Sequence, residues 1–340
     1  MLPVQGVSTH YLHCHRPGSF FNSVRVCPVS RLFCLVALLF VANAQAEVRL
    51  LTSIKPLQLI AAAVQEGVGE PEVLLPPGAS PHHYALRPSD VRRVRDADLL
   101  YWIGPDMEAF LPRVLGSRDK PQVAVQDLPG MTLRHFGDSH DRHDHDEHAD
   151  EHEHAADELG HDHEHRPGSL DAHLWLAADN ARVIAARMAA DLTKLDAANA
   201  ARYAANLQAF EARLDALDGR IRPRLAALQG KPYFVFHEAF DYFEAAYGLK
   251  HAGVFSVLAE VQPGARHVAA MRKTLQQAGP SCVFSEPPLR PRLAETLTAG
   301  LPVKLAELDA LGGTLPVNAT AYERLLENLA GGLTQCLGNL

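Results

Sequence analysis

The sequence predicts an α/β protein with two lobes, each a mostly parallel sheet flanked by helices, bridged by one long rigid helix. Three observations support this fold class. From residue 47 onward, short runs rich in β-branched and aromatic residues alternate with amphipathic segments, a pattern typical of parallel sheets. The chain of 340 residues is long for one domain, and its hydrophobic content of 47% can fill two cores. Residues 196–228 separate the two alternating halves and carry one apolar stripe.

The predicted N-terminal lobe covers residues 47–195. Turn signals such as Pro76-Pro77-Gly78 and Gly104-Pro105 end two of its apolar runs, which we therefore expect to be strands. Pro56 suits the first turn of a helix, where the missing amide hydrogen of proline costs nothing. We expect strands at residues 48–53, 72–75, 98–103 and 122–125, and helices starting at Pro56 and at residues 88–96, 107–114 and 179–192.

The predicted linker helix covers residues 196–228. Large apolar side chains recur there at steps of three and four residues, which places them on one helical face. As one continuous helix the segment would be about 50 Å long, at 1.5 Å per residue. Pro223 should kink or loosen the last turns because it removes a backbone hydrogen bond. The recurring residues are Tyr203, Leu207, Phe210, Leu214, Leu217, Ile221 and Leu225.

The predicted C-terminal lobe, residues 229–340, repeats the alternation of the first lobe. Gly248 follows one of its amphipathic runs, where glycine commonly ends a helix. We expect strands at residues 233–236, 254–257, 282–285 and 303–308, and helices at residues 239–247, 263–278, 290–299 and 321–337.

Residues 1–46 have the organisation of a leader with a signal peptide. Arg31 precedes an apolar run at residues 32–41, and Ala44-Gln45-Ala46 supplies the small residues of a cleavage site. The run is short for a membrane span, so an uncleaved anchor is the less favoured alternative. We therefore expect export, with cleavage after Ala46.

Cleavage after Ala46 would leave Cys282 and Cys336 as the two cysteines of the mature chain. An even pair in an exported protein favours a disulfide. Closing a loop of this length contributes roughly 4 kcal/mol when the lost entropy of the unfolded chain is counted. Two buried free thiols are the alternative, and a thiolate metal site is less favoured because no CxxC spacing is present.

Residues 138–165 contain nine histidines among twelve Asp and Glu residues. With almost no apolar side chains, this tract cannot offset the entropy of ordering its backbone, so we expect a loop without a folded core. Imidazoles beside carboxylates attract ions such as Zn²⁺, although a solvated acidic loop with incidental histidines is the alternative. The expected weaker, auxiliary ligands are His140, His143, His145, His148, His152, His154, His161, His163 and His165.

The formal net charge of −8 is concentrated in this tract, which carries one basic and twelve acidic residues. The three arginines of residues 1–46 offset part of that charge, and the rest of the chain is near neutral. A protein that binds nucleic acid needs a basic surface, so the charge distribution argues against a nucleic-acid partner.

Several polar side chains follow predicted strands or turns. His237 comes directly after the predicted strand 233–236, and open α/β sheets bind ligands beyond the carboxyl ends of their strands. A hydrogen-bonded structural role is the default for any one such residue. Their number, in an exported chain with a metal-attracting tract, favours a site. The other candidates are His82, His83, His173, Glu286 and Asp309.

The chain resembles the zinc-binding solute-binding proteins of bacterial ABC transporters, the ZnuA type of the metal-binding cluster A-I family. The resemblance covers nearly all of residues 47–340 and consists of long, ordered matches, which are far more specific than one short motif. The matches are VLLPPGASPHHYALRPSDVRRVRDADLLYWIGPDMEAFL from Val73, AHLWL from Ala172, YFVFHEAFDYFEAAYGL from Tyr233, EVQPGAR from Glu260, CVFSEPPLRP from Cys282 and LAELDALGG from Leu305.

The resemblance implies that His82, His173 and His237, in the SPH, HLW and VFH motifs, ligate Zn²⁺ between the lobes. Some members have Glu before the first ligand, where this chain has Pro81, so Asp309 or a water would complete four-coordination. His83 is open as an alternate ligand. The His-rich loop, the bridging helix and a disulfide in the C-terminal lobe are also family features.

The implied function is high-affinity capture of Zn²⁺ in the periplasm and delivery to an ABC-transporter permease, by a monomer that is not an enzyme. Three imidazoles with one oxygen suit tetrahedral Zn²⁺, whereas a manganese-specific protein of the same fold would draw on more carboxylates. A zinc metallohydrolase is another alternative, with Glu238 as the general base, but no HExxH motif is present. A periplasmic metal buffer without a transporter partner is a further alternative.

Overall fold

The computed structural model describes residues 47–137, 168–256, 265–287 and 292–340. The expected signal peptide, its cleavage site and the tract 138–165 lie outside the described residues. Residues 47–340 form one unit by their internal contacts. Within the described part of the chain, no helix combines the length and the apolar character needed to cross a membrane.

Two four-stranded sheets form the framework, and all of their strand pairs are parallel. The first sheet has the order β2-β1-β3-β4 and the second the order β6-β5-β7-β8. The predicted two-lobe α/β fold is confirmed. The strands are β1 Leu50–Thr52, β2 Glu72–Val73, β3 Leu99–Trp102, β4 Gln122–Ala124, β5 Tyr233–His237, β6 Gly253–Ser256, β7 Ser281–Ser285 and β8 Val303–Glu307.

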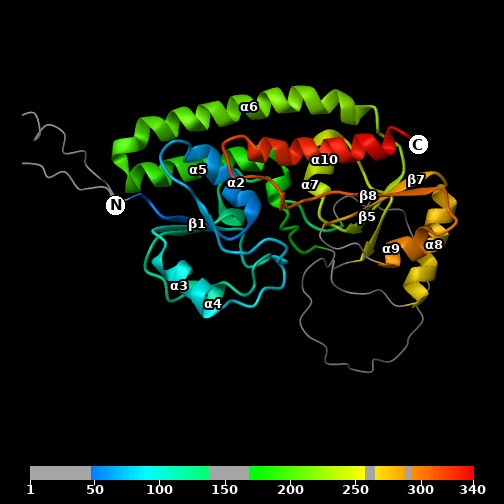
Figure 1. Ribbon diagram of the computed structural model, residues 1–340, viewed down its shortest axis with the longest axis horizontal. Helices are drawn as coiled ribbons and strands as arrows, with labels where there is room; N and C mark the ends of the chain where they lie inside the picture. The colour runs from blue at the N-terminus through cyan, green and yellow to red at the C-terminus, as the bar shows by residue number, and fades with distance from the viewer. Residues whose placement is uncertain (1–46, 138–167, 257–264, 288–291) are drawn as a thin grey trace, which may run out of the picture. The chain divides into compact units, whose positions relative to one another are not determined.

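The helices pack on the sheets and on one another. Figure 1 shows the long helix α6 running beside α5 and α10, and α6 packs against both of them. The α-helices are α2 Lys55–Val64, α3 Pro88–Asp96, α4 Pro112–Leu115, α5 Ala178–Leu195, α6 Ala200–Ala226, α7 Asp241–Tyr247, α8 Ala265–Ala278, α9 Arg292–Thr298 and α10 Ala321–Leu337. The short 3₁₀ helices in the described part of the chain are η1 Val125–Asp127, η2 Leu174–Leu176 and η3 Ala197–Asn199.

The linker helix is shorter than the predicted segment 196–228. It starts at Ala200, after η3, because Asp196 ends the preceding helix and accepts hydrogen bonds from the Asn199 amide (2.7 Å) and the Tyr203 hydroxyl (2.9 Å). The 27 residues of α6 give a length of about 40 Å. The helix continues through Pro223. Six of the seven predicted stripe residues are buried, and Leu207 is half-buried. The exact domain boundaries stay a prediction.

The prediction of a helix at residues 107–114 is wrong, because α4 covers only Pro112–Leu115. The segment before α4 forms turns around Glu108. The buried carboxylate of Glu108 accepts hydrogen bonds from the backbone amides of Ile103 (2.9 Å) and Gly104 (3.1 Å). Pro112 has no amide hydrogen to continue a preceding helix, but it suits the first turn of a new one. Burial raises the pKa of Glu108 to about 7.

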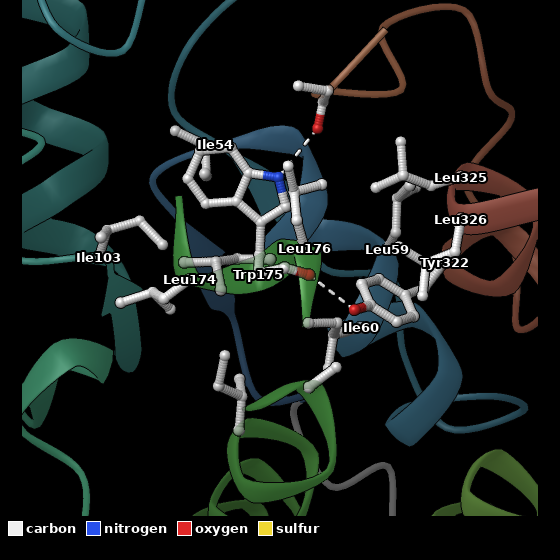
Figure 2. Packing of buried hydrophobic residues seen from close by; sticks show 14 of the residues in the cluster. Ile54, Leu59, Ile60, Ile103, Leu174, Trp175, Leu176, Tyr322, Leu325 and Leu326 are labelled. Atoms are coloured by element: carbon white, nitrogen blue, oxygen red, sulfur yellow. Dashed lines mark hydrogen bonds between the residues drawn. The ribbon is translucent and has the colours of Figure 1, made fainter. Parts of the chain in front are cut away.

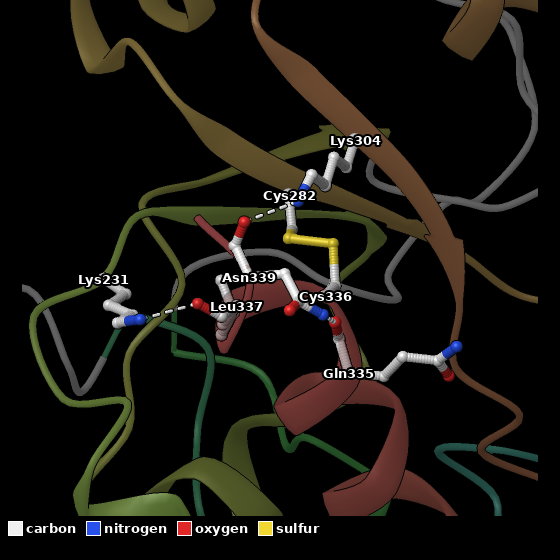
Figure 3. Close-up of a disulfide and its surroundings, with 7 residues drawn as sticks. All are labelled: Lys231, Cys282, Lys304, Gln335, Cys336, Leu337 and Asn339. Atoms are coloured by element: carbon white, nitrogen blue, oxygen red, sulfur yellow. Dashed lines mark hydrogen bonds between the residues drawn. A yellow bond between two sulfur atoms is a disulfide. The ribbon is translucent and has the colours of Figure 1, made fainter.

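The predicted disulfide is present between Cys282 on β7 and Cys336 on α10, and both cysteines are buried. The expectation of two free thiols as an alternative is therefore wrong. Figure 3 shows the same end of α10 held at two further points. Lys231 donates to the Leu337 carbonyl at 2.7 Å, and Lys304 donates to the Asn339 carbonyl at 2.6 Å. The C-terminal helix is thereby fastened to the second sheet.

The two lobes share one buried apolar cluster. One fully buried member is Trp175 on η2, whose surroundings include side chains from α2 and α10 (Figure 2). The indole Nε1 donates to the Ala310 carbonyl at 2.8 Å, and the Tyr322 hydroxyl donates to the Trp175 carbonyl at 2.6 Å. Because Trp175 comes from the first half and Ala310 and Tyr322 from the second, these bonds fix η2 against the C-terminal lobe.

Candidate metal centre

Three histidines from separate parts of the chain meet between the two sheets. His82 lies in the loop after β2, His173 is the N-cap residue of η2, and His237 is the last residue of β5. All three are buried, with exposed fractions of 8%, 3% and 4%. The resemblance named these residues, and the structure brings them together.

The spacing of the three rings suits one shared ion. One ring nitrogen of each histidine lies within 4.8 Å of the corresponding atoms of the other two. The ring centroids are 5.4 Å apart for His82 and His173, 5.3 Å for His82 and His237, and 4.9 Å for His173 and His237. Zn–N bonds of about 2.0–2.1 Å place tetrahedral ligand atoms roughly 3.4 Å apart, so a small closure would form a zinc site.

The path of the loop that carries His82 is set by Pro76, Pro77 and Gly78. Backbone hydrogen bonds from Leu74 and Leu75 to the end of β1 continue the pairing of β2 for two residues. Gly78 then adopts a φ of +77°, in the left-handed region that favours glycine. The chain turns there and brings His82 to the carboxyl end of the first sheet.

His173 is oriented by Asp171, a residue to which the sequence analysis gave no role. The carboxylate oxygen Oδ1 lies 2.8 Å from His173 Nδ1 and also accepts a hydrogen bond from the His173 backbone amide at 3.0 Å. With Nδ1 as the donor, Nε2 keeps its lone pair for a metal ion. Burial raises the pKa of Asp171 well above its ordinary value. The sequence feature that could have indicated this role is the position of Asp171, two residues before the ligand His173.

Asp171 is itself held from the other lobe. The Tyr242 hydroxyl, on α7, donates to the Asp171 carbonyl at 2.9 Å and accepts a hydrogen bond from the Arg134 amide, also at 2.9 Å. Arg134 and Asp171 are in turn joined by a backbone hydrogen bond of 2.9 Å. One buried tyrosine of the C-terminal lobe therefore fixes the segment that leads to His173.

His237 has its own carboxylate partner. Glu286, immediately after β7, places Oε1 2.8 Å from His237 Nδ1. This second imidazole–carboxylate pair leaves Nε2 of His237 for the metal in the same way as the first. The predicted position of Glu286 at the end of a strand is confirmed.

Asp309 follows β8 and lines the same cavity as the three histidines, but it lies outside their cluster. Its Oδ1 accepts hydrogen bonds from the amides of Leu311 (3.0 Å) and Gly312 (2.8 Å). Its Oδ2 accepts one from the Gly313 amide at 2.8 Å. Both oxygens thus stabilise a turn. The role of Asp309 as fourth ligand stays a prediction, and this geometry favours the alternative that a water completes the coordination.

Two other sequence candidates do not join the centre. His83 is exposed. Glu238, the candidate general base, lies in a separate group with Asp241 and His251, whose ligand atoms are within 4.8 Å of one another. Burial raises the pKa of Glu238. The described residues therefore do not group Glu238 with the three histidines, as a hydrolytic base there would require.

The centre opens into a cavity of about 650 Å³. Side chains from both lobes line it, and most of its wall is apolar. Among the lining residues are Ile54, Lys55, Leu75, Trp175, Glu286 and Leu311. Three imidazoles at a partly enclosed site can bind a divalent ion reversibly, with coordination positions left for oxygen ligands.

Comparison with known proteins agrees with this arrangement. Residues 50–336 match the family profile ZnuA, described as zinc-uptake complex component A, periplasmic. The high-affinity zinc uptake system protein ZnuA of Yersinia pestis is 40% identical over 294 residues, which cover 86% of this chain and 92% of that protein. The protein of the same name from Haemophilus ducreyi is 37% identical over 298 residues, which cover 87% of this chain and 94% of that protein.

Solved structures share the fold. A crystal structure of ZnuA superposes with a TM-score of 0.66 at 20% identity, over 84% of this chain and 99% of that one. The periplasmic zinc-binding protein TroA of Treponema pallidum gives a TM-score of 0.66 at 18% identity, over 86% and 99% of the two chains. On the family profile and the identity to curated relatives, the chain belongs to the ZnuA family of periplasmic zinc-uptake components.

Proposed function

We propose that this protein captures Zn²⁺ in the periplasm with high affinity and delivers it to the permease of an ABC transporter. The observation that carries the proposal is the buried convergence of His82, His173 and His237, in a chain whose relatives are zinc uptake proteins. Each histidine comes from a different element, so a tight site requires the folded two-lobe structure. Zn²⁺ is the transported cargo.

The choice of zinc over manganese rests on the donor atoms. Three neutral imidazoles suit zinc, whereas Mn²⁺ sites draw on more carboxylate oxygen. Two carboxylates, Asp171 and Glu286, are hydrogen-bonded to the Nδ1 atoms of two ligands and serve to orient them. We therefore assign His82, His173 and His237 as ligands. Because the relatives of this chain are zinc uptake proteins, we also infer that the protein is not an enzyme.

The proposal also covers export of the chain, its oligomeric state and the role of the tract 138–165. We infer that cleavage after Ala46 releases a mature chain that begins at Glu47 and works as a monomer. The histidines of the tract 138–165 would collect further ions with lower affinity. Mass spectrometry of the exported protein tests the cleavage site, and size-exclusion chromatography with light scattering tests the monomer.

Two experiments test the function. Zinc titration against a competing chelator should find one tight equivalent, with much weaker binding of Mn²⁺. Cells that lack the gene should grow poorly when zinc is chelated and recover on expression of the wild-type chain, with the His237→Ala variant failing to restore growth. Tight manganese binding would favour the manganese-specific alternative, and growth that does not depend on the gene would favour a metal buffer.

A further inference from the structure

The cavity beside the three histidines is much larger than a zinc ion needs. Its volume of about 650 Å³ falls within the range of small-molecule sites, about 300–1,000 Å³. One water molecule takes up about 30 Å³ in the liquid. A site for a bare ion and one water would require only a small part of this space.

The metal centre is open toward that space. Three imidazoles leave at least one coordination position of a zinc ion unfilled. Asp309 is the residue that the sequence suggested as the fourth ligand. Its carboxylate accepts three backbone hydrogen bonds within its own turn. Glu286, the other carboxylate in the cavity wall, is bonded to His237. Because all three histidines line the cavity, an ion that they hold would lie at its wall.

A cation also faces the cavity. Lys55 lines it at the first position of α2, is half-buried, and has a pKa lowered by that burial. Among the described residues, no carboxylate forms an ion pair with Lys55. Glu286 and Asp309 are engaged elsewhere, so an incoming anion is the partner that would stabilise this charge.

The backbone near Lys55 adds to this preference. Helix α2 has ten residues, its N-cap Ile54 makes no side-chain capping hydrogen bond, and both Ile54 and Lys55 line the cavity. The first amides of a helix favour negative charge, although Pro56 in the first turn of α2 has no amide hydrogen to contribute. The rest of the wall is largely apolar, with Leu75, Trp175 and Leu311 among its residues, and can contact a carbon skeleton.

We propose that this cavity binds zinc together with one small organic carboxylate, whose oxygen takes the unfilled coordination position and whose charge pairs with Lys55. The carboxylate oxygen replaces a water on the ion, and no covalent or redox step is involved. This inference rests on the proposed function, and it narrows the cargo to Zn²⁺ carried as a complex with a small carboxylate chelator.

Calorimetry with oxalate as the probe tests the proposal. The full chain is loaded with one equivalent of Zn²⁺ and titrated with oxalate, and metal-free protein is titrated in parallel. We expect one oxalate to bind the zinc-loaded protein and none to bind the metal-free protein. Oxamide, a neutral compound of the same shape, should bind at least tenfold more weakly because it cannot pair with Lys55.

A pair of variants locates the oxalate. Lys55→Met, which keeps the length of the side chain and removes its charge, should weaken oxalate binding about tenfold. Lys194→Met is the matched control, since Lys194 is an exposed lysine on α5, and it should bind oxalate like the wild type. Zinc affinity is measured for each variant without oxalate, so that loss of metal is separated from loss of oxalate.

Each outcome decides the proposal. Tight zinc binding without any oxalate binding would overturn it and leave the zinc-capture function intact. Oxalate binding that does not need zinc, or that Lys55→Met leaves unchanged, would place the oxalate elsewhere and overturn it as well. Failure of the wild-type chain to bind zinc at all would instead contradict the proposed function.

Discussion

Glu286 meets His237 because of the register between β5 and β7. Paired residues of these parallel strands, such as Tyr233 with Cys282 and Val235 with Phe284, are 49 positions apart. His237 and Glu286 are also 49 positions apart, so they continue this register at the carboxyl end of the sheet and come within 2.8 Å. The sheet thereby sets both the position and the hydrogen-bonding partner of a ligand.

This pairing predicts the effect of Glu286→Gln. The amide keeps the size of the side chain but removes the negative charge that orients the imidazole and makes it more basic. We expect zinc affinity to fall about 10- to 100-fold, the usual cost of losing such a partner. Competition with a zinc chelator measures the change. Glu295→Gln, an exposed position on α9, is the control, and equal affinities of the two variants would contradict a role for Glu286.

Tyr242→Phe should affect both stability and zinc binding. The change removes the hydroxyl that joins Arg134 to Asp171, and it leaves a buried amide and carbonyl without that partner. We expect the free energy of unfolding to fall by about 1–3 kcal/mol. Zinc affinity should also fall, because Asp171 orients His173. Urea unfolding of the metal-free protein and zinc competition measure the two effects, and an unchanged zinc affinity would show that Asp171 holds its place without Tyr242.

Glu108 predicts a pH dependence of stability. Its pKa in the folded protein is about 7, above the ordinary value of 4.5, so between these values the folded state binds more protons than the unfolded state. Stability therefore falls as pH rises from about 4.5 to 7, by roughly 3 kcal/mol from this one group. Urea unfolding of metal-free protein at pH 5 and pH 8 should show a smaller loss for Glu108→Gln than for wild type. The exposed control Glu66→Gln should behave like wild type, and equal losses in all three proteins would refute the assignment.

The disulfide predicts that the exported protein has no free thiol. A thiol assay after denaturation without reductant should find none, and two free sulfhydryls would contradict the bond seen between Cys282 and Cys336. Replacing both cysteines by serine should lower the free energy of unfolding by about 2–5 kcal/mol, because the unfolded chain gains freedom. Zinc affinity at low temperature should change little. Cys336 lies in the last turn of α10, and neither cysteine lines the cavity of the three histidines.

Much of the fold follows from local patterns in the sequence. The eight strands of the described residues lie within two residues of their predicted limits, because short apolar runs bounded by proline and glycine are typical of buried strands. The prediction of a helix at 107–114 is wrong because Glu108 turns back to bond the amides at residues 103 and 104, a tertiary contact that periodicity does not report. The start of α6 depended on local hydrogen bonds from Asn199 and Tyr203 to Asp196, which periodicity also does not report.

The site was predictable only in part. The resemblance named the three histidines, and the ends of predicted strands marked His237, Glu286 and Asp309. Their roles depended on long-range geometry. The strand register made Glu286 a partner of His237, whereas backbone amides of a Gly-Gly turn engaged Asp309. No local pattern could indicate that the Tyr242 hydroxyl would donate a hydrogen bond to the Asp171 carbonyl, 71 positions away.

The tract 138–165 should bind zinc separately from the three-histidine site. The sequence predicts no folded core in this tract, so ions bound there would have to order the chain around them and should bind with lower affinity. Deletion of these residues should remove the weaker zinc equivalents and keep one tight equivalent. The weaker equivalents should also fade as pH falls through about 6.5, where histidine ordinarily becomes protonated. Calorimetry checks both effects, and loss of the tight equivalent would mean that the tract holds the true site.

The most direct test of the account is zinc competition with His237→Ala in the background that lacks residues 138–165. His83→Ala is the matched control, because His83 follows His82 directly but is exposed and lies outside the cluster. We expect His237→Ala to lower the affinity for Zn²⁺ by at least about 100-fold, since loss of a direct ligand should cost more than loss of its hydrogen-bonding partner. His83→Ala should leave the affinity unchanged. Wild-type affinity in the His237→Ala variant would contradict the three-histidine centre.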